Sequence, residues 1–525
     1  MKKALIIVFC ILSLAACSKA PVTLPELYSD HCVLQRDRTL PVWGWSDPKA
    51  KVTITWQGKS TVVRADAEGF WKAELPATPA GGPYELKVND SIVRDILVGD
   101  VFLCSGQSNM ELPVKRCLDV VADEIKGYSN DQIRYLKVPV TFAFDGPCKD
   151  LPECKWEVLD SEQTGLEWGA VCYFTARYLQ ESTGVPVGMV NSSVGGSPIE
   201  AWLREDALPD YALEELRSLQ DHAIVDSLYN YNDHLYSEWQ EAHNALPAPA
   251  GERWRPADIF SKAWAVDSKG DNIYGSHILR RTIKLSAAQA GAGILHLGAI
   301  VDADSTFVNG QLVGSTTYRY PPRNYPVPDT LLREGDNVVE IHLYAYGPEP
   351  ASFVPDKNYS LDTPAGNISL LKGWEHKAGR RMPARGTQIF LQYKAAGLYN
   401  AMSAPLRDFA FDGFIWYQGE SNCSNAASYG KLLETLVNTR REELATPDLH
   451  CYIIELAAFE HSELRDSDSG WNRVQKEQRR TAQKVDGVYL VPNADLGEWN
   501  DIHPQDKATV GRRTVDVILS SRAAE

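Results

Sequence analysis

Ser108 stands in a segment whose pattern suits a serine nucleophile. Residues 99–112 read GDVFLCSGQSNMEL, so an apolar run (101–104) leads through Gly106 into a short polar turn, and a helix can begin at Met110. Such a turn lifts one hydroxyl to the end of a buried strand, where the N–H groups of a helix start can stabilise an oxyanion. Most serines in strand-to-helix turns are only helix caps, so this segment alone favours catalysis and capping about equally.

A candidate base lies near the other end of the chain. His503 follows a short polar run that begins at Asn500, and it is one of only 11 histidines. A serine nucleophile needs a base, and histidine serves best near neutral pH. By itself, a histidine before a proline in a polar loop is more often a surface residue. The pair forms a catalytic hypothesis only if one sheet edge brings Ser108 and His503 together.

Two more apolar runs end in the same kind of polar turn. Residues 187–197 read VGMVNSSVGGS, and residues 414–422 read FIWYQGESN. Strands that each end in Gly, Ser, Asn, Gln or Glu predict one shared site at the carboxyl edge of an open α/β sheet, where such folds bind their ligands.

Four motifs in this order resemble the sialate O-acetylesterase family of the SGNH-hydrolase superfamily: GQSNM at 106–110, GGSPIEAW at 195–202, WYQGESN at 416–422 and DIHPQDK at 501–507. The segment GLYNAMSAPL at 397–406 is similar to a further family segment. Each motif is weak alone, and together they are specific. The resemblance implies a serine carbohydrate esterase with a three-layer parallel-sheet hydrolase fold, no metal and no organic cofactor.

The resemblance also implies roles for individual residues. Ser108 would attack an acetyl ester, His503 would take its proton, and water would hydrolyse the acetyl-enzyme. The oxyanion hole would combine the Ser108 N–H, a backbone N–H of a Gly-Gly pair and a side-chain amide. The candidates for the last two donors are Gly195, Gly196, Gln418 and Asn422.

The acidic partner of the histidine is open. Many superfamily members carry Asp three residues before the histidine, but this chain has Asn500 there and Asp501 only two residues before His503. In an extended segment, side chains two apart share a face, so Asp501 can reach the imidazole with some bending. Glu420 resembles the acid of some related carbohydrate esterases and is slightly favoured. A Ser-His dyad without an acid is a third alternative.

The resemblance implies O-acetylated glycans as the substrate, with 9-O-acetyl sialic acid first and acetylated xylan or pectin as alternatives. Arg440, Arg441 and Arg473 are candidates for pairing a sialate carboxylate, although arginines on helices are usually solvated.

Two other classes of function remain as alternatives to an esterase. One is a non-catalytic glycan-binding surface lipoprotein. The other is a glycoside hydrolase using Glu420 and Asp501, which would leave Ser108 without a role.

The charge balance disfavours nucleic acid as a partner. The 525 residues include 69 acidic and 53 basic side chains, which gives a net charge of −16 and repels phosphate. The 14 Trp and 23 Tyr suit either core packing or stacking on sugar rings.

Residues 1–17 have the pattern of a bacterial lipoprotein signal peptide. Two lysines precede an apolar core at 4–12 that is too short to span a bilayer, and Leu14-Ala15-Ala16-Cys17 resembles a lipobox. We expect an exported protein held by a lipid on Cys17, in the periplasm or at the outer membrane or cell surface. The lipid anchor would be its only membrane contact.

Eight cysteines follow the leader, and export permits disulfides between them, although the sequence does not fix a pairing. Cys104, Cys172 and Cys451 lie in apolar runs and are predicted to be buried free thiols. The sequence contains no Cys-x-x-Cys pair, which disfavours a zinc site.

The pattern of strands, turns and helices predicts four parts after the leader. Residues 20–97 have the short alternating strands of a β-sandwich. Residues 98–245 begin the hydrolase, with helices at 170–179 and 211–245. Residues 250–380 resemble a jelly-roll module inserted into the hydrolase, in which Asn309-Gly310 predicts a hairpin turn and a structural role is favoured over sugar binding. Residues 385–525 complete the hydrolase, with a helix at 471–485.

Overall fold

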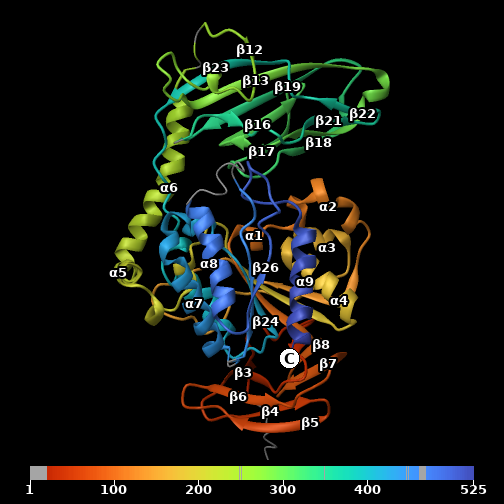
Figure 1. Ribbon diagram of the computed structural model, residues 1–525, viewed down its shortest axis with the longest axis vertical. Helices are drawn as coiled ribbons and strands as arrows, with labels where there is room; N and C mark the ends of the chain where they lie inside the picture. Colours follow the sequence, from red (N-terminus) through yellow and green to blue (C-terminus); the bar gives the residue numbers. More distant parts are fainter. Residues whose placement is uncertain are drawn as a thin grey trace, which may run out of the picture.

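The computed structural model describes residues 20–524, except 248, 250, 348, 445, 447 and 460–468. Figure 1 shows three parts stacked along the long axis: N-terminal β-sheets, a central α/β body and a second group of β-sheets. Mixed α/β architecture, as expected from the sequence, is confirmed. The expected leader and Cys17 lie outside the described residues. Among the described residues, every helix is too short or too polar to cross a membrane.

The central body is built on a sheet of seven main strands, in the order β10-β9-β11-β8-β24-β25-β26. All neighbouring pairs are parallel except β10–β9. The bounds are β8 (Ser91–Gly106), β9 (Asn130–Lys137), β10 (Glu157–Leu159), β11 (Val187–Ser193), β24 (Gly413–Tyr417), β25 (His450–Ile454) and β26 (Val488–Val491). The apolar runs at 101–104, 187–190 and 414–417 are therefore central, buried strands, as such continuous runs predict.

The chain direction reverses beside β8. From β8 the chain first crosses to β9, two positions away, and β11 then fills the place between β9 and β8. After β24 the chain continues through β25 and β26 on the other side. Gly106 at the end of β8 pairs with Ser193 of β11 and with Tyr417 of β24. A reversal of this kind, called a switch point, leaves a crevice at the carboxyl ends of the strands, where open α/β sheets bind ligands. We call this edge of the sheet the switch-point edge. Three of the four polar motifs begin at this point.

Helices flank the sheet on both sides. Figure 1 shows α7 and α8 on one side of β24 and β26, and α4 and α9 on the other. The bounds are α4 (Ala170–Thr183), α7 (Ala426–Glu443), α8 (Gly470–Lys484) and α9 (Lys507–Ala523). The helices predicted at 170–179 and 471–485 are confirmed.

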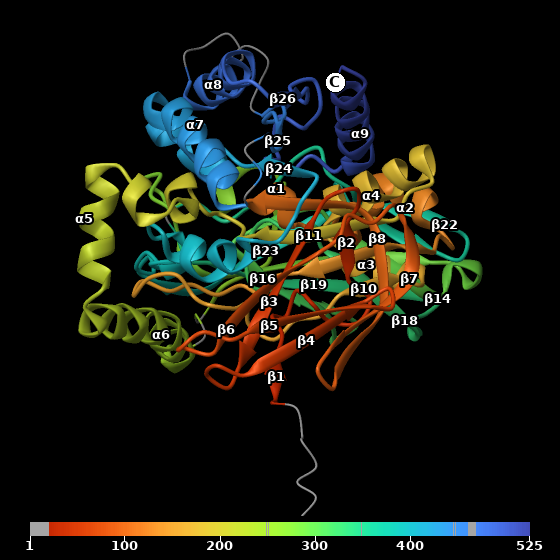
Figure 2. The ribbon, with the colours of Figure 1, turned by 90° about the horizontal axis from the view of Figure 1, so that it is seen from below.

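The helix predicted at 211–245 is two helices, α5 (Asp210–Leu219) and α6 (His222–Ala245). The break occurs because the Asp221 side chain accepts a hydrogen bond from the Ala223 N–H at 3.0 Å and so caps a new helix. Figures 1 and 2 place α5 and α6 along one flank of the body, and α6 leads to the second group of β-sheets.

One of the two N-terminal sheets, formed by β2, β4, β5 and β7, is continuous with the central sheet, whereas β1, β3 and β6 form a separate sheet. Figure 2 shows β3, β4, β5 and β6 in front, on the side of the molecule that is opposite the switch-point edge. The first half of β8 pairs with β7 (Gly81–Val88), and its second half enters the parallel sheet. The other bounds are β1 (Val22–Thr23), β2 (Val33–Gln35), β3 (Leu40–Ser46), β4 (Lys51–Trp56), β5 (Lys59–Arg64) and β6 (Phe70–Leu75). The expected domain boundaries stay predictions; β8 crosses the one between 97 and 98.

The inserted β domain consists mainly of two antiparallel sheets, in the orders β12-β23-β13-β19-β16-β17 and β18-β14-β21-β22. Its own apolar cluster includes Leu279, Leu295, Ile341 and Trp374. The hairpin predicted at Asn309-Gly310 is confirmed, because both residues have positive φ and join β16 to β17. The main bounds are β12 (Arg255–Ala257), β13 (Tyr274–Leu285), β14 (Gly291–Leu297), β16 (Ala303–Val308), β17 (Gln311–Thr316), β18 (Asn324–Leu332), β19 (Gly335–Ala345), β21 (Tyr359–Thr363), β22 (Gly366–Ser369) and β23 (Trp374–Met382).

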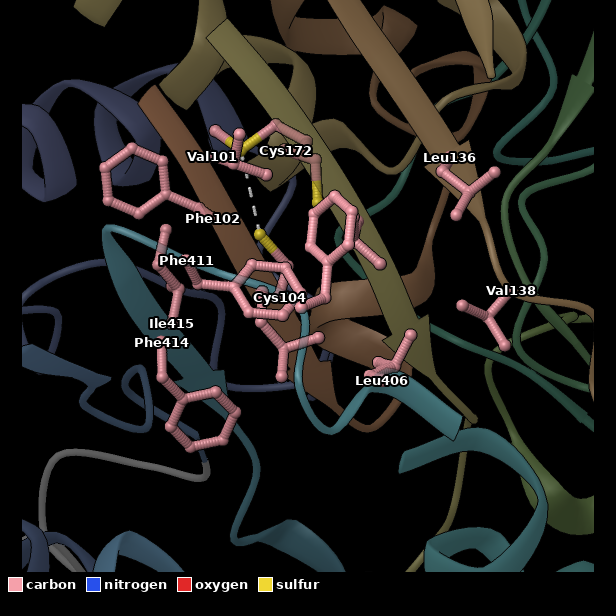
Figure 3. Packing of buried hydrophobic residues seen from close by; sticks show 14 of the residues in the cluster. Val101, Phe102, Cys104, Leu136, Val138, Cys172, Leu406, Phe411, Phe414 and Ile415 are labelled. Atoms are coloured by element: carbon pink, nitrogen blue, oxygen red, sulfur yellow. Dashed lines mark hydrogen bonds between the residues drawn. The ribbon is translucent and has the colours of Figure 1, made fainter. Parts of the chain in front are cut away.

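The core around β8 is dry and closely packed. Figure 3 shows Phe102 and Cys104 of β8 beside Phe414 and Ile415 of β24, all fully buried. Cys104, Cys172 and Cys451 are buried free thiols, as predicted, and four further described cysteines are free thiols as well: Cys32, Cys117, Cys148 and Cys154. Such a core holds the end of β8 rigidly and therefore fixes the turn that follows it.

Candidate active site

Glycine at 106 makes the Ser108 turn possible. Gly106 has φ of +136°, and a Cβ there would lie 2.1 Å from the carbonyl oxygen of Tyr417. The next residue, Gln107, donates its N–H to the same oxygen at 3.0 Å and leads into α1 (Ser108–Glu111). Ser108 is half-buried between the buried side chains of Gln107 and Asn109. The turn therefore leaves the Ser108 hydroxyl accessible and keeps the side chains of Gln107 and Asn109 buried.

The structure brings the two catalytic candidates together across 395 residues. His503 Nε2 lies 2.9 Å from Ser108 Oγ, which is hydrogen-bond distance. His503 sits in the loop between β26 and α9, and the Asp506 side chain caps α9 by accepting the Thr509 N–H at 2.9 Å. Only 9% of the His503 surface is exposed. The imidazole is thus held against the hydroxyl and shielded from bulk water.

Asp501 is the carboxylate that faces the imidazole. Its Oδ1 lies 3.6 Å from His503 Nδ1, an ion-pair separation longer than a hydrogen bond, and accepts the His503 backbone N–H at 2.8 Å. Burial opposes ionisation of Asp501, but the His503 side chain and the Lys357 ammonium outweigh it and hold the pKa of Asp501 below its ordinary value. Asp501 is therefore ionised at neutral pH, as a partner of an imidazolium must be.

Glu420, which the sequence slightly favoured as the acid, is turned toward another partner. Its Oε1 accepts a hydrogen bond from Asn109 Nδ2 at 2.5 Å, and its Oε2 is buried with no partner among the described residues. Burial raises the pKa of Glu420 against the opposing effect of Asn109. The geometry therefore favours Asp501 over Glu420 as the group that orients His503.

Lys507 completes a buried polar chain behind Ser108. Its Nζ donates to Asn109 Oδ1 at 2.5 Å, and Asn109 in turn donates to Glu420 and to the Ile502 carbonyl at 2.8 Å. Burial lowers the pKa of Lys507 to about 8. Asn109 thereby ties the Ser108 turn to the 418–422 turn and to the histidine loop. The DIHPQDK motif contains Lys507, but its role was not recognised from the sequence.

One of the two glycine amides proposed for the oxyanion hole is occupied. The Gly195 N–H donates to Glu111 Oε2 at 2.5 Å, so it serves an oxyanion only after Glu111 moves. The neighbouring Gly196, with φ of +77°, lies against the Tyr393 ring. The Ser108 N–H is the first amide of α1, and helix geometry gives such an amide no intrahelical acceptor. Ser108 is therefore the best-placed donor of the proposed set.

The two side-chain amides proposed for the oxyanion hole have other hydrogen-bond partners in the structure. Gln418 donates to the Ser197 carbonyl at 3.2 Å and to Asn422 Oδ1 at 2.7 Å. Asn422 donates to Glu200 Oε2 at 2.9 Å and accepts the Ile199 N–H at 3.0 Å. These bonds lock the turns after β11 and β24 to each other. Neither amide lines the cleft at Ser108.

A cleft of about 1100 Å³ opens in front of Ser108 and His503. Its walls come from the body and from the inserted β domain, and they carry several aromatic rings: Tyr236, Tyr318, Tyr320, Tyr346, Phe390 and Tyr393. Burial raises the pKa of Tyr393 to about 12, so this phenol stays neutral. Within the described chain, no three His, Cys, Asp or Glu side chains meet in a way that could hold a metal ion.

The arginines suggested by the sequence do not face this cleft. Arg440 is buried and donates to the Trp202 carbonyl at 3.0 Å, and Arg441 donates to the Leu449 carbonyl at 3.1 Å. The arginines that line the cleft are Arg116, Arg319 and Arg385. Sequence analysis missed all three because none of them stands in one of the motifs. Arg319 belongs to the inserted β domain, and Arg385 belongs to the segment that follows it.

The comparison with protein families decides the class of this chain. Residues 98–230 and 382–519, together more than half of the chain, match the model of the family described as carbohydrate esterase, sialic acid-specific acetylesterase. The chain belongs to this family. The two matched segments are the parts of the body on either side of the inserted β domain, so the resemblance noted from the motifs is confirmed.

Named relatives of the chain agree with this assignment. Sialate O-acetylesterases from Pongo abelii and Homo sapiens are each 34% identical over 196 residues, which cover 33% of this chain and 37% of theirs. The match thus spans little more than a third of those relatives. A crystal structure of a carbohydrate acetylesterase from Xanthomonas citri is similar over 96% of this chain and 76% of its own, with a TM-score of 0.58 and 25% identity.

Proposed function

We propose that this protein is a serine carbohydrate esterase that removes O-acetyl groups from glycans. The observation that carries the proposal is the 2.9 Å contact between Ser108 Oγ and His503 Nε2 at the switch point of the sheet. Family membership supports the reaction class, and Asp501 beside the imidazole supports the catalytic roles.

The geometry supports an acetyl-enzyme mechanism. Ser108 Oγ attacks the acetyl carbonyl carbon while His503 Nε2 takes the hydroxyl proton, and Asp501 stabilises the imidazolium that forms. The sugar oxygen leaves with that proton, and an acetyl ester remains on Ser108. Water then attacks this ester, gives a proton to His503 and releases acetate, and the proton returns to Ser108. The Ser108 N–H stabilises the oxyanion in both halves, joined by the Gly195 N–H once Glu111 has moved.

The cleft supports a sugar substrate, with 9-O-acetyl sialic acid as the leading candidate. Its volume exceeds what an acetyl group needs, and its aromatic walls suit the faces of sugar rings. Arg116 and Arg385 each have a buried Nε with no partner among the described residues, whereas Arg319 is paired with Asp302. Two such guanidinium groups suit the carboxylate of an acidic sugar.

The test is acetate release by the chain that lacks residues 1–17. O-acetylated sialic acids, acetylated xylan, acetylated pectin and p-nitrophenyl acetate are each offered to the wild type, Ser108→Ala and His503→Ala. His342→Ala, on the inserted domain away from the cleft, is the matched control. Loss of release in the two site variants but not in the control supports the esterase, and the preferred glycan identifies the substrate. No release from any ester by the wild type overturns it and favours a glycan-binding role.

We also propose that the mature protein is exported and anchored by a lipid on Cys17. The basic start, short apolar core and lipobox of residues 1–17 support this. Cys17→Ala should move the protein from the membrane fraction to the soluble fraction and remove the mass of the lipid from the mature chain.

We also propose the finer fold assignment, an SGNH-type hydrolase with an inserted jelly-roll domain. The motifs and the strand order of the central sheet support it.

A further inference from the structure

We propose that the inserted β domain holds the catalytic histidine loop in place, with Lys357 and Tyr320 as positioning residues for Asp501 and His503. The inference rests on the proposed esterase function and goes beyond it. It gives the inserted domain a role in the turnover step, in place of the purely structural role that the sequence favours.

Lys357 is the first contact. Its side chain is only 10% exposed, and its Nζ lies 3.2 Å from Asp501 Oδ2 and in hydrogen-bond contact with Glu498. Asp501 uses its other oxygen, Oδ1, for the His503 backbone N–H and the imidazole. The carboxylate is thus held from both sides, by the inserted domain on Oδ2 and by the histidine on Oδ1. A carboxylate fixed in this way cannot rotate away from the imidazole.

Tyr320 is the second contact, and it acts on the histidine itself. The two rings meet edge to face, with centroids 5.4 Å apart and an angle of 89° between their planes. An aromatic pair of this kind restricts the rotation of both rings. Tyr320 also lines the cleft beside Ser108, so it limits the space into which the imidazole could turn.

A hydrogen bond from a side chain to a backbone carbonyl anchors the start of the same loop. Asn500 Nδ2 donates to the Pro355 carbonyl of the inserted domain at 2.5 Å. Asn500 stands where many superfamily members carry the acid, and here its side chain faces the inserted domain. Four contacts therefore join residues 498–503 to Tyr320 and to residues 355–357 of the inserted domain. Loop residues are the most mobile parts of a site, and small misplacements of a catalytic group cost large factors in rate.

The test combines kinetics with hydrogen exchange on the chain that lacks residues 1–17. The variants are Lys357→Met, Lys357→Arg, Tyr320→Ala and Tyr320→Phe. Lys377→Met is the matched control, because Lys377 is half-buried on the same domain and packs over Trp254 away from the loop. With p-nitrophenyl acetate, which carries no sugar, we expect Lys357→Met and Tyr320→Ala to lower kcat about tenfold. KM should stay within about twofold in Lys357→Met, because Lys357 does not line the cleft, and Lys357→Arg and Tyr320→Phe should retain most of the activity.

Two further readouts separate positioning from general stability and from the reaction itself. In an Asp501→Asn background, Lys357→Met should change kcat less than about twofold, because its effect passes through Asp501. Amide exchange in residues 498–503 should accelerate in Lys357→Met and stay unchanged in Lys377→Met, whether or not the protein cleaves an ester. Unchanged exchange, or equal losses in Lys357→Met and Lys377→Met, overturns the proposal. A wild type that cleaves no ester but shows the exchange change overturns only the esterase function.

Discussion

Replacing each candidate acid by its amide separates Asp501 from Glu420. Asp501→Asn keeps the shape and an acceptor for the His503 N–H, but it removes the charge 3.6 Å from His503 Nδ1. At that separation an effective dielectric constant of about 20 gives an interaction of roughly 4–5 kcal/mol. Water at the partly exposed Asp501 and the charge on Lys357 cut this to about half. We therefore expect kcat to fall about 50-fold, with little change in KM.

Glu420→Gln should cost about tenfold or less. The amide oxygen still accepts from Asn109, and no contact between Glu420 and the imidazole is lost. Glu498→Gln, on the same loop as Asp501 but facing Lys357, is the matched control and should stay within about threefold of the wild type. Steady-state kinetics with p-nitrophenyl acetate and circular dichroism on each variant make the comparison. A loss of about 50-fold in Glu420→Gln beside a near-normal Asp501→Asn would refute the assignment of Asp501.

Three other predictions concern the scaffold. Gly106→Ala should lower the melting temperature and kcat together, because its Cβ would meet the Tyr417 carbonyl at 2.1 Å; normal values of both would contradict the role of the turn. Ile415→Ala, in the fully buried strand β24, should cost about 2–5 kcal/mol in urea unfolding, and a loss below 1 kcal/mol would show a loosely packed centre. Burial lowers the pKa of Lys507 to about 8, so between there and the unfolded value near 10.4 the unfolded chain binds more protons. The unfolding free energy of the wild type should then rise by about 3 kcal/mol relative to Lys507→Met across that window, and a constant difference would show an ordinary lysine.

Local patterns were sufficient to predict that Ser108 and His503 share one edge of the sheet. An apolar run that ends at Gly106 can only be a buried strand followed by a tight turn, and the same holds for the runs before Ser193 and Gln418. These patterns depend on residues close in sequence. The order of the strands then brings Ser108 and His503 together, because the carboxyl ends of parallel strands share one edge.

Side-chain directions and long-range contacts were not predictable in the same way. Gln418 and Asn422 lie on the expected turn, but their amides satisfy each other and the neighbouring turn instead of facing Ser108. Lys357 meets Asp501 across 144 residues, and no periodic pattern marks such a pair. Glu420, the acid slightly favoured from the sequence, accepts a hydrogen bond from Asn109 across 311 residues, and no local pattern marks that contact either.

The central claim is that Ser108 carries the acetyl group between the two halves of the reaction. The most direct test mixes the protein with p-nitrophenyl acetate, quenches the reaction with acid within milliseconds and maps the modified peptide by mass spectrometry. The account predicts one acetyl group, on Ser108, that is absent from Ser108→Ala and forms far more slowly in His503→Ala. Hydrolysis with no acetylated intermediate, or with the acetyl group on another residue, would contradict it.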